Sequence, residues 1–230
     1  MAVSSTPRAR KPRTAQAFTR KLLAWYRRAA RDLPWRRTRD PYRVLVSEFM
    51  LQQTQVSRVA EFYPRFLERF PDLGTLARAP ARQVREAWDG LGYYARASNL
   101  HALARVVRHD LGGTLPDNPE ELMKLPGIGP YTAGAVASFA YEKPVPAVDT
   151  NVARVIRRVF GSAKRGMRNA ELWRLAQALV PRDGKRAWKF NQAVMELGAL
   201  ICVARKPKCP QCPVREVCRT GKARRTDAQR

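Results

Sequence analysis

The sequence lacks any apolar run as long as about 18 residues, and no hydrophobic segment follows its basic N-terminus. It therefore offers neither a transmembrane helix nor a secretory signal, and we expect an intracellular protein. Stretches of alternating polar and apolar residues, which would predict β-strands, are missing as well. Helical spacing of apolar residues predominates instead, which predicts an all-α fold.

Acidic residues are scarce: 19 Asp and Glu against 44 Lys and Arg leave a net charge of +25. Solubility alone needs a net charge of only about 2–8, so the excess indicates a polyanionic partner, for which nucleic acid is the strongest candidate. A merely solvated basic surface is the alternative. Residues 1–15 are basic and aperiodic, so we expect a disordered arm there, and residues 221–230 form a basic tail.

Cysteine is absent from the first 201 residues of the chain. All four cysteines then follow within the last 30 residues, at Cys202, Cys209, Cys212 and Cys218. In a reducing compartment such clustering favours a metal site over disulfides. The run has one C-x2-C pair between wider gaps, whereas zinc ribbons usually pair two such knuckles. Because a compact four-thiolate loop can also hold an iron–sulfur cluster, spacing alone leaves both metals open.

A glycine hairpin at Leu125–Tyr131 separates two helical segments. Gly127 and Gly129 can take a positive φ and expose backbone N–H groups, and the helix that opens near Tyr131 directs its positive end toward the same place, which suits a phosphate. The following segment, Thr132–Tyr141, is rich in small residues. This composition predicts a buried helix that another helix can approach closely.

Prolines 144 and 146 force an extended chain that leads to Asp149. Residues 151–160 carry apolar side chains on one helical face, so Asp149 or Thr150 should begin a helix. Helix capping is the ordinary role of such an aspartate, and catalysis is the alternative.

Glu48 lies in the apolar part of the segment 41–58. Desolvation on such a helix would raise its pKa, as a general acid working near neutral pH requires. The alternative places Glu48 on a solvent-facing stripe with Arg43 and Gln52. The uncharged run at residues 52–55 suits a surface that meets base edges, or it ends the helix.

A second glycine loop, residues 90–96, combines Tyr93 and Tyr94 with the cation of Arg96. Paired aromatics in a basic protein can wedge into a base stack. Core packing is the alternative for each tyrosine.

Together these motifs resemble the helix-hairpin-helix (HhH-GPD) DNA glycosylase superfamily, from about Arg31 to Cys218, and within it the adenine glycosylases of the MutY type. The hairpin, the aspartate at a helix start and the cysteine spacing are similar to the superfamily as a whole. Residues 47–56 and 90–94 are similar to the MutY branch in particular. The resemblance implies a [4Fe–4S] cluster on the four cysteines.

The fold implied by the resemblance has two helical lobes that flank a DNA-binding cleft. A six-helix barrel lobe that contains the helix-hairpin-helix spans residues 33–143. Residues 16–32 and 144–220 together form the cluster lobe.

By the resemblance, Glu48 protonates a flipped adenine and Asp149 stabilises the sugar cation, as two carboxylates do in glycoside hydrolysis. Tyr131 stands where bifunctional members have a lysine, which implies a monofunctional enzyme. The resemblance adds Arg31, Tyr131 and Asn151 to the catalytic residues. It implies DNA contacts by Gln52, Gln53, Tyr93, Gly127, Gly129, Arg205, Lys206 and Lys208.

Two features depart from the MutY pattern. Thr150 stands where that branch usually has glycine, and the C-terminal domain with which the branch reads 8-oxoguanine is not in this sequence. We therefore expect adenine excision opposite G or 8-oxoguanine with little preference between the two. The alternatives are a G·T or G·U mismatch thymine/uracil glycosylase, which differs at Gln52 and Gln53, and a non-catalytic iron–sulfur DNA-binding protein.

The substrate implied is double-stranded DNA that contains a mismatch or a damaged base. We expect a monomer that works in the bacterial cytoplasm at the nucleoid, without a membrane partner.

Overall fold

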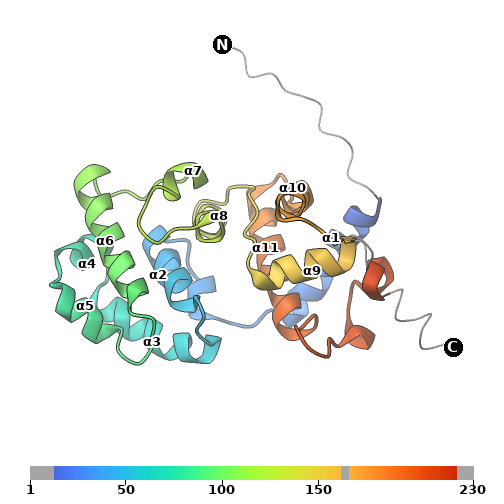
Figure 1. Cartoon of the computed structure of the whole chain (residues 1–230), viewed down its shortest axis with the longest axis horizontal. Helices are drawn as coiled ribbons and strands as arrows, with labels where there is room; N and C mark the ends of the chain where they lie inside the picture. Colours follow the sequence, from blue (N-terminus) through green and yellow to red (C-terminus); the bar gives the residue numbers. More distant parts are fainter. Residues whose placement is uncertain (1–12, 162–165, 222–230) are drawn as a thin grey trace, which may run out of the picture. The chain divides into compact units, whose positions relative to one another are not determined.

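The computed structural model describes residues 13–161 and 166–221, which form helices joined by loops (Figure 1). No β-strand occurs in these two ranges, as the sequence predicted. Contacts divide the chain into two compact units. We call residues 31–149 with 182–191 the central unit, and the rest of the described chain the terminal unit. No helix of the described ranges is both long and apolar enough to cross a membrane.

The central unit consists of helices α2 to α8, one 3₁₀ turn and the first half of α11. Their bounds are η1 Pro34–Arg36, α2 Pro41–Leu51, α3 Val56–Arg69, α4 Leu73–Arg78, α5 Ala81–Ala87, α6 Ala95–Asp110, α7 Pro119–Leu122 and α8 Pro130–Phe139. Helix α7 is a single turn of 4 residues before the hairpin, so the range 33–143 contains six longer helices and this turn.

Helix α2 is central to the packing of this unit, since it contacts α3, α6 and α8. Residues 52–55 do end the helix, because α2 ends at Leu51 and α3 begins only at Val56. Aromatic side chains fill the core around it. Trp35 is buried, and its ring meets Tyr63 edge-on with centroids 5.7 Å apart.

Helix α8 is buried on every side from Thr132 to Phe139. Its small residues allow close packing, and at Gly134 the approach is extreme. A Cβ atom on Gly134 would lie 2.2 Å from the carbonyl oxygen of Pro146. The extended segment 144–149 therefore passes directly against α8, which fixes the backbone just before Asp149.

The terminal unit gathers elements from both ends of the described chain. They are α1 Arg13–Ala29, α9 Thr150–Phe160, α10 Asn169–Leu179, the second half of α11 (Gly184–Leu200), η2 Cys209–Gln211 and η3 Arg215–Val217. The apolar face of α9 is buried through Val152, Val155, Ile156 and Val159. Phe18 of α1 meets Phe160 of α9 edge-on, with ring centroids 5.2 Å apart.

The structure differs from the sequence prediction in several segments. Helix α1 begins at Arg13, so the last three residues of the expected arm 1–15 are helical; the rest of that arm and residues 222–230 of the tail lie outside the described residues. Residues 31–32, 144–149 and 182–191, expected in the cluster lobe, belong to the central unit. Residues 144–149 do so because Pro146 lies against α8. Residues 182–191 do so because Asn191 donates a hydrogen bond to the carbonyl oxygen of Val145.

Candidate functional site

Glu48 is buried in the middle of α2, with 4% of its surface exposed. Asp40 begins this helix by accepting a hydrogen bond from the Arg43 N–H at 2.8 Å, and Pro41 occupies the first turn. Seven other residues of the helix are also buried. The solvent-facing alternative for Glu48 is therefore wrong, because apolar neighbours cover nearly the whole circumference of the helix.

Tyr131 contacts the Glu48 carboxylate directly. Its hydroxyl donates a hydrogen bond to Glu48 Oε2 at 2.6 Å. Burial, with the nearby carboxylates of Glu48 and Asp149, raises the pKa of Tyr131 well above its usual range. The phenol thus keeps its proton and remains a donor.

Burial raises the pKa of Glu48 to about 7. Three charged or polar groups modify that effect. The hydrogen bond from Tyr131 and the charge of Arg36 lower the pKa, while the negative charge of Asp149 raises it. A carboxyl group with a pKa near neutrality can hold a proton and give it up at working pH, which is what general acid catalysis requires.

Asp149 reaches this site at the end of the extended segment 144–149. Asn191 of α11, 2% exposed, braces that segment: its Nδ2 donates to Val145 O and to Ser138 Oγ, both at 2.9 Å. Its Oδ1 accepts from the Ala147 N–H at 3.4 Å. Helix α9 begins at Thr150, immediately after Asp149, as the apolar pattern predicted.

Arg36 is a site residue that the sequence did not reveal. It lies in the 3₁₀ turn η1, where no helical periodicity marks a face, and its charge acts on Glu48 from a distance of 12 positions in sequence. Its Nη1 donates to the carbonyl oxygen of Arg31 at 3.0 Å. Arg31, predicted as a catalytic residue, thus contributes its backbone to the placement of Arg36.

Asn151 has its described contacts within the terminal unit. Its Oδ1 accepts a hydrogen bond from Arg154 Nη2 at 2.7 Å, and the same nitrogen donates to Gly198 O at 2.9 Å. A Cβ on Gly198 would lie 2.7 Å from the Asn151 Cβ. These contacts pack Asn151 tightly against α11 in that unit.

The hairpin glycines differ from the prediction at one position. Gly127 has φ +76°, and a Cβ there would lie 2.7 Å from the Asn99 Cβ, so only glycine fits. Gly129, however, has φ −96° and is extended, because it is the residue before the first turn of α8. The expected positive φ therefore holds for Gly127 and is wrong for Gly129.

Two segments predicted to contact DNA, residues 52–55 and 90–96, each contain an exposed residue whose backbone is in the left-handed conformation. Gln53 has φ +57° and Tyr93 has φ +49°. Tyr93 is 62% exposed, so the core-packing alternative is wrong for it. Tyr94 is half-buried and donates its hydroxyl proton to Asp89.

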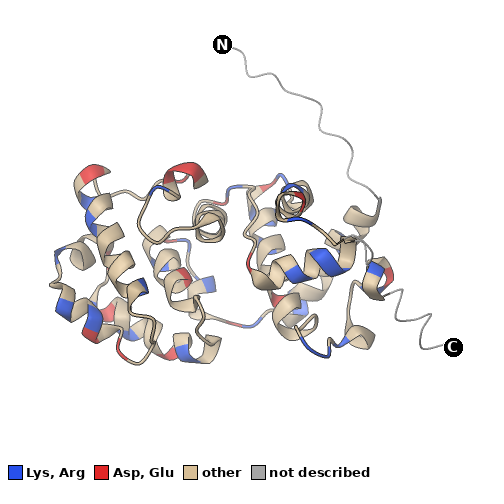
Figure 2. Ribbon diagram, viewed as in Figure 1, with Lys and Arg blue, Asp and Glu red and all other residues tan. Residues whose placement is uncertain are grey.

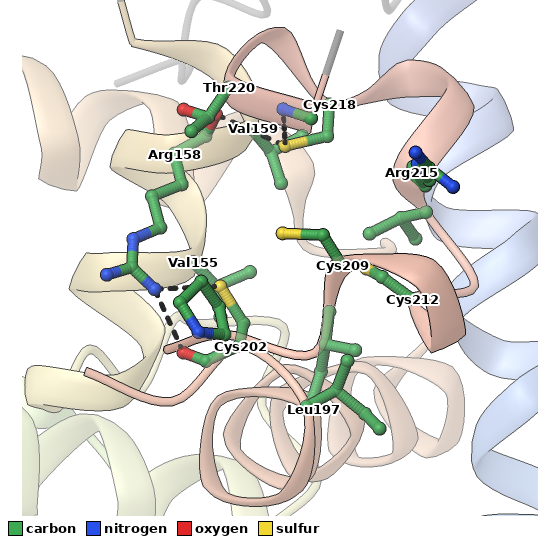
Figure 3. Close-up of a pocket in the computed structure, with 14 residues that line it drawn as sticks. Val155, Arg158, Val159, Leu197, Cys202, Cys209, Cys212, Arg215, Cys218 and Thr220 are labelled. Carbon is green, nitrogen blue, oxygen red and sulfur yellow. Dashed lines mark hydrogen bonds between the residues drawn. The ribbon is translucent and has the colours of Figure 1, made fainter. Parts of the chain in front are cut away.

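The four cysteines line one pocket of the terminal unit, and Figure 3 shows the sulfur atoms of Cys202, Cys209 and Cys218 turned toward the same space. Apolar side chains form much of the remaining wall: Val155, Val159, Leu197, Ile201, Pro207 and Val214. Within the described ranges, no three His, Cys, Asp or Glu side chains are placed to hold one metal ion. Four thiols on one pocket with apolar walls are the donor set of an iron–sulfur cluster.

Two arginines of α9 hold the loop that begins at Cys202. Arg154 Nε donates to Cys202 O at 2.8 Å. Arg158 Nη1 donates to Val203 O at 2.7 Å and to Cys202 Sγ at 3.5 Å. These hydrogen bonds hold the start of the loop, with Cys202, against α9.

Two regions of the chain match known protein families. Residues 46–178 match the model of the HhH-GPD superfamily base excision DNA repair proteins, and residues 202–218 match that of the iron–sulfur binding domain of endonuclease III. The chain thus carries the iron–sulfur binding motif, and all four cysteines lie within it.

The adenine DNA glycosylase of Homo sapiens is 46% identical over 88% of this chain, which covers 39% of that protein. The thymine-DNA glycosylase of Aeropyrum pernix is 38% identical over 88% of this chain and 93% of that protein. The chain spans between 39% and 66% of the length of the mammalian and mycobacterial adenine glycosylases that it matches.

Two solved structures have the same fold. A thermostable thymine-DNA glycosylase, 35% identical, superposes with a TM-score of 0.85 over 91% of this chain and 97% of its own. Endonuclease III in a trapped covalent intermediate with DNA, 26% identical, superposes with a TM-score of 0.78 over 94% of this chain and 100% of its own. From its family model, its cysteine motif and these relatives, the chain belongs to the HhH-GPD superfamily of base excision DNA repair proteins.

Proposed function

We propose that this protein is a monofunctional DNA glycosylase that hydrolyses the N-glycosidic bond of an adenine mispaired with G or 8-oxoguanine. The observation that carries the proposal is the buried Glu48, whose pKa is about 7 and which is hydrogen-bonded by Tyr131 and influenced by Asp149. The adenine glycosylases at 45–48% identity support adenine as the base. Double-stranded DNA as the partner is supported by the fold shared with endonuclease III bound to DNA.

The two carboxylates divide the chemistry between them. Glu48 gives its proton to a ring nitrogen of the flipped adenine, so that the electron pair of the glycosidic bond leaves with a neutral base. The sugar becomes an oxocarbenium-like cation, which the Asp149 carboxylate stabilises by charge. Water then attacks C1′ and loses its proton to Glu48, which restores the acid.

Tyr131 keeps Glu48 oriented through its hydroxyl. A phenol cannot form the imine through which a lysine would cleave the DNA strand. The proposed reaction therefore stops at an abasic site.

The protein is proposed to act as a monomer at the bacterial nucleoid, in the cytoplasm. Its charge supports a nucleic-acid partner, and Figure 2 shows Lys and Arg on helices of both units. We call residues 202–218, which carry the four cysteines, the cysteine loop. In it Arg205, Lys206 and Lys208 are all exposed. We assign them to phosphate contacts, with the cluster fixing the loop that carries them.

Removing the positive charges of the cysteine loop is expected to weaken binding to DNA of any sequence. In the triple variant Arg205→Gln, Lys206→Gln and Lys208→Gln, the negative slope of log Kobs against log salt should become less steep by roughly one unit for each phosphate that the loop no longer neutralises. Fluorescence anisotropy on matched and mismatched duplexes measures this slope. Weaker binding to the mismatched duplex alone would show that these side chains read bases instead.

Anaerobically purified protein is expected to contain about four irons per chain, the number in a cluster with four thiolate ligands. Changing Cys212 to Ser should remove most of this iron and lower the melting temperature, because cluster binding contributes to folding. Metal analysis and thermal denaturation measure both results. Stoichiometric zinc in place of iron would contradict the cluster assignment.

A second candidate function is excision of thymine or uracil from G·T and G·U pairs. It is favoured by the thymine-DNA glycosylase of Aeropyrum pernix, because this chain covers 93% of that protein. Single-turnover assays on duplexes with A·8-oxoG, A·G, G·T and G·U, with and without alkali, distinguish the candidates. Strand breakage only after alkali, from the two adenine duplexes, is the expected result.

Other outcomes of this panel assign the protein differently. Cleavage of only the G·T and G·U duplexes would select the second candidate. Strand breakage without alkali would contradict the monofunctional assignment. Binding to all four duplexes without any base loss would leave a non-catalytic iron–sulfur protein.

A further inference from the structure

Arg96 is a buried cation that the proposed chemistry does not use. It lies in the first turn of α6, and only 7% of its surface is exposed. A buried guanidinium is costly unless its N–H groups are hydrogen-bonded. Those of Arg96 donate to backbone carbonyl oxygens of two separate segments of the central unit.

The first segment is the end of α2. Arg96 Nη1 donates to Phe49 O at 3.1 Å, to Met50 O at 2.7 Å and to Gln52 O at 2.6 Å. The last carbonyls of a helix lack partners within the helix and carry its negative dipole end. The guanidinium therefore caps α2 and makes the chain turn at Gln52.

The second segment is the glycine loop before α6. Arg96 Nη2 donates to Leu91 O at 3.0 Å and to Gly92 O at 2.9 Å, while Nε donates to Tyr93 O at 3.4 Å. The guanidinium carbon also lies 5.6 Å from the centre of the Tyr93 ring. One side chain thus joins two loops whose sequences are about 40 positions apart.

Each joined segment contains a residue in a conformation that non-glycine residues rarely adopt. Gln53 has φ +57° and Tyr93 has φ +49°. Such residues persist only where their surroundings fix them. Tyr93 is 62% exposed and gains little from burial, so the hydrogen bonds to its loop are the visible constraint.

We propose that Arg96 is a positioning residue that joins the Gln52–Gln53 turn and the Tyr93 loop, so that the two segments act on the duplex as one wedge. The inference rests on the proposed function for the identity of the substrate. The planar guanidinium is needed because its five donors lie in a fixed fork, whereas a lysine ammonium is a single point and cannot serve both segments.

A double-mutant cycle of Arg96→Lys with Tyr93→Ala tests the proposal. Arg96→Lys keeps the charge but loses the fork, and we expect single-turnover excision from duplex DNA to slow by about 10- to 100-fold, the size of effect that misplaced groups produce. In the Tyr93→Ala background the same change should cost less than about threefold, because the wedge is already lost. Arg82→Lys, an exposed arginine of α5 in the same unit, is the matched control and should change the rate by less than about twofold.

A second measurement separates positioning from loss of stability. With 2-aminopurine beside the target base, binding of the wild-type protein should raise the fluorescence as the stack opens, and Arg96→Lys and Tyr93→Ala should each remove most of that rise. The salt slope of binding should stay unchanged, because Arg96 is buried and contacts no phosphate. All measurements are made below the melting temperature of each variant, and Arg96→Gln, which keeps two donors, replaces Arg96→Lys if the latter does not fold.

The proposal is overturned if Arg96→Lys slows excision by the same factor with and without Tyr93, or if the fluorescence rise is unaffected. A salt slope less steep by about one unit in Arg96→Lys would assign Arg96 to a phosphate instead. The fluorescence arm does not require excision. If the wild-type protein opens the stack but removes no base, the proposed function fails while the role of Arg96 is still decided.

Discussion

Changing Asp149 to Asn is expected to slow base excision by at least about 10³-fold while DNA affinity stays within a few-fold. The amide has nearly the same shape as the carboxylate but no negative charge to stabilise the sugar cation. Single-turnover excision of adenine and anisotropy on the same duplex measure the two quantities. Since the charge matters only when the cation forms, the loss should fall on the chemical step and not on binding.

Asp183 offers a matched control for this change. It too precedes a helix, α11, and its Oδ1 accepts a hydrogen bond from the Arg186 N–H at 2.8 Å. Asp183→Asn should leave excision within about twofold of wild type, because that aspartate serves only the helix end. Excision by Asp149→Asn at the rate of Asp183→Asn would show that Asp149 is a helix cap and nothing more.

Changing Glu48 to Gln is expected to slow turnover by about 10²- to 10⁴-fold, the usual contribution of a general acid. In the wild-type protein the rate should fall as pH rises through about 7, because the pKa of Glu48 is raised to about 7 and only the protonated acid is active. That limb should be absent from the residual rate of the variant. Tyr131→Phe should move the limb to higher pH, since the hydrogen bond from Tyr131 lowers the Glu48 pKa.

The Glu48→Gln change is also expected to stabilise the fold above neutral pH. Between the unfolded pKa of 4.5 and the native value of about 7, the native state binds more protons at Glu48 than the unfolded chain does. The free energy of unfolding therefore falls as pH rises through this interval, and the stability seen below it is lost above it. The difference between the two pKa values corresponds to roughly 3 kcal/mol.

Urea unfolding of the wild-type protein and of Glu48→Gln measures this effect. Near pH 8 the variant should be more stable by about 2–3 kcal/mol, and near pH 4 the two should be nearly equal. Glu61→Gln, at a half-exposed position with ion pairs to Arg58 and Arg65, is the control and should shift stability little at either pH. A Glu48→Gln variant less stable than wild type near pH 8 would contradict the burial that raises the Glu48 pKa.

Local sequence patterns predicted the elements that bear the carboxylates. The apolar surroundings of Glu48 predicted its burial, and prolines 144 and 146 predicted the extended approach to Asp149. Both predictions depend on residues within a few positions of the site. For the same reason the helix starts near Pro41, Pro130 and Thr150 could be expected to within about two residues.

The groups that hold the carboxylates in place could not be read from such patterns. Asn191 braces the Asp149 segment from 44 or more positions away, and Arg36 reaches Glu48 from a 3₁₀ turn. In the sequence Arg96 is only a cation beside two tyrosines, although its hydrogen-bond partners begin 47 positions earlier, at Phe49. Such contacts are set by the packing of whole helices, which leaves no periodic mark on either partner.

Two demands conflict at Gly134, which lacks the methyl group of an alanine: the stability of helix α8 and the space that the neighbouring segment needs. Alanine would make α8 a better helix by up to about 1 kcal/mol, so a redesign guided by stability alone would select it. Yet the new methyl would lie 2.2 Å from the Pro146 carbonyl oxygen and would displace the extended segment that ends at Asp149. The helix gives up intrinsic stability at this position so that a carboxylate three residues beyond Pro146 can be held in place, which makes Gly134 a position where engineering for heat resistance and preserving activity conflict.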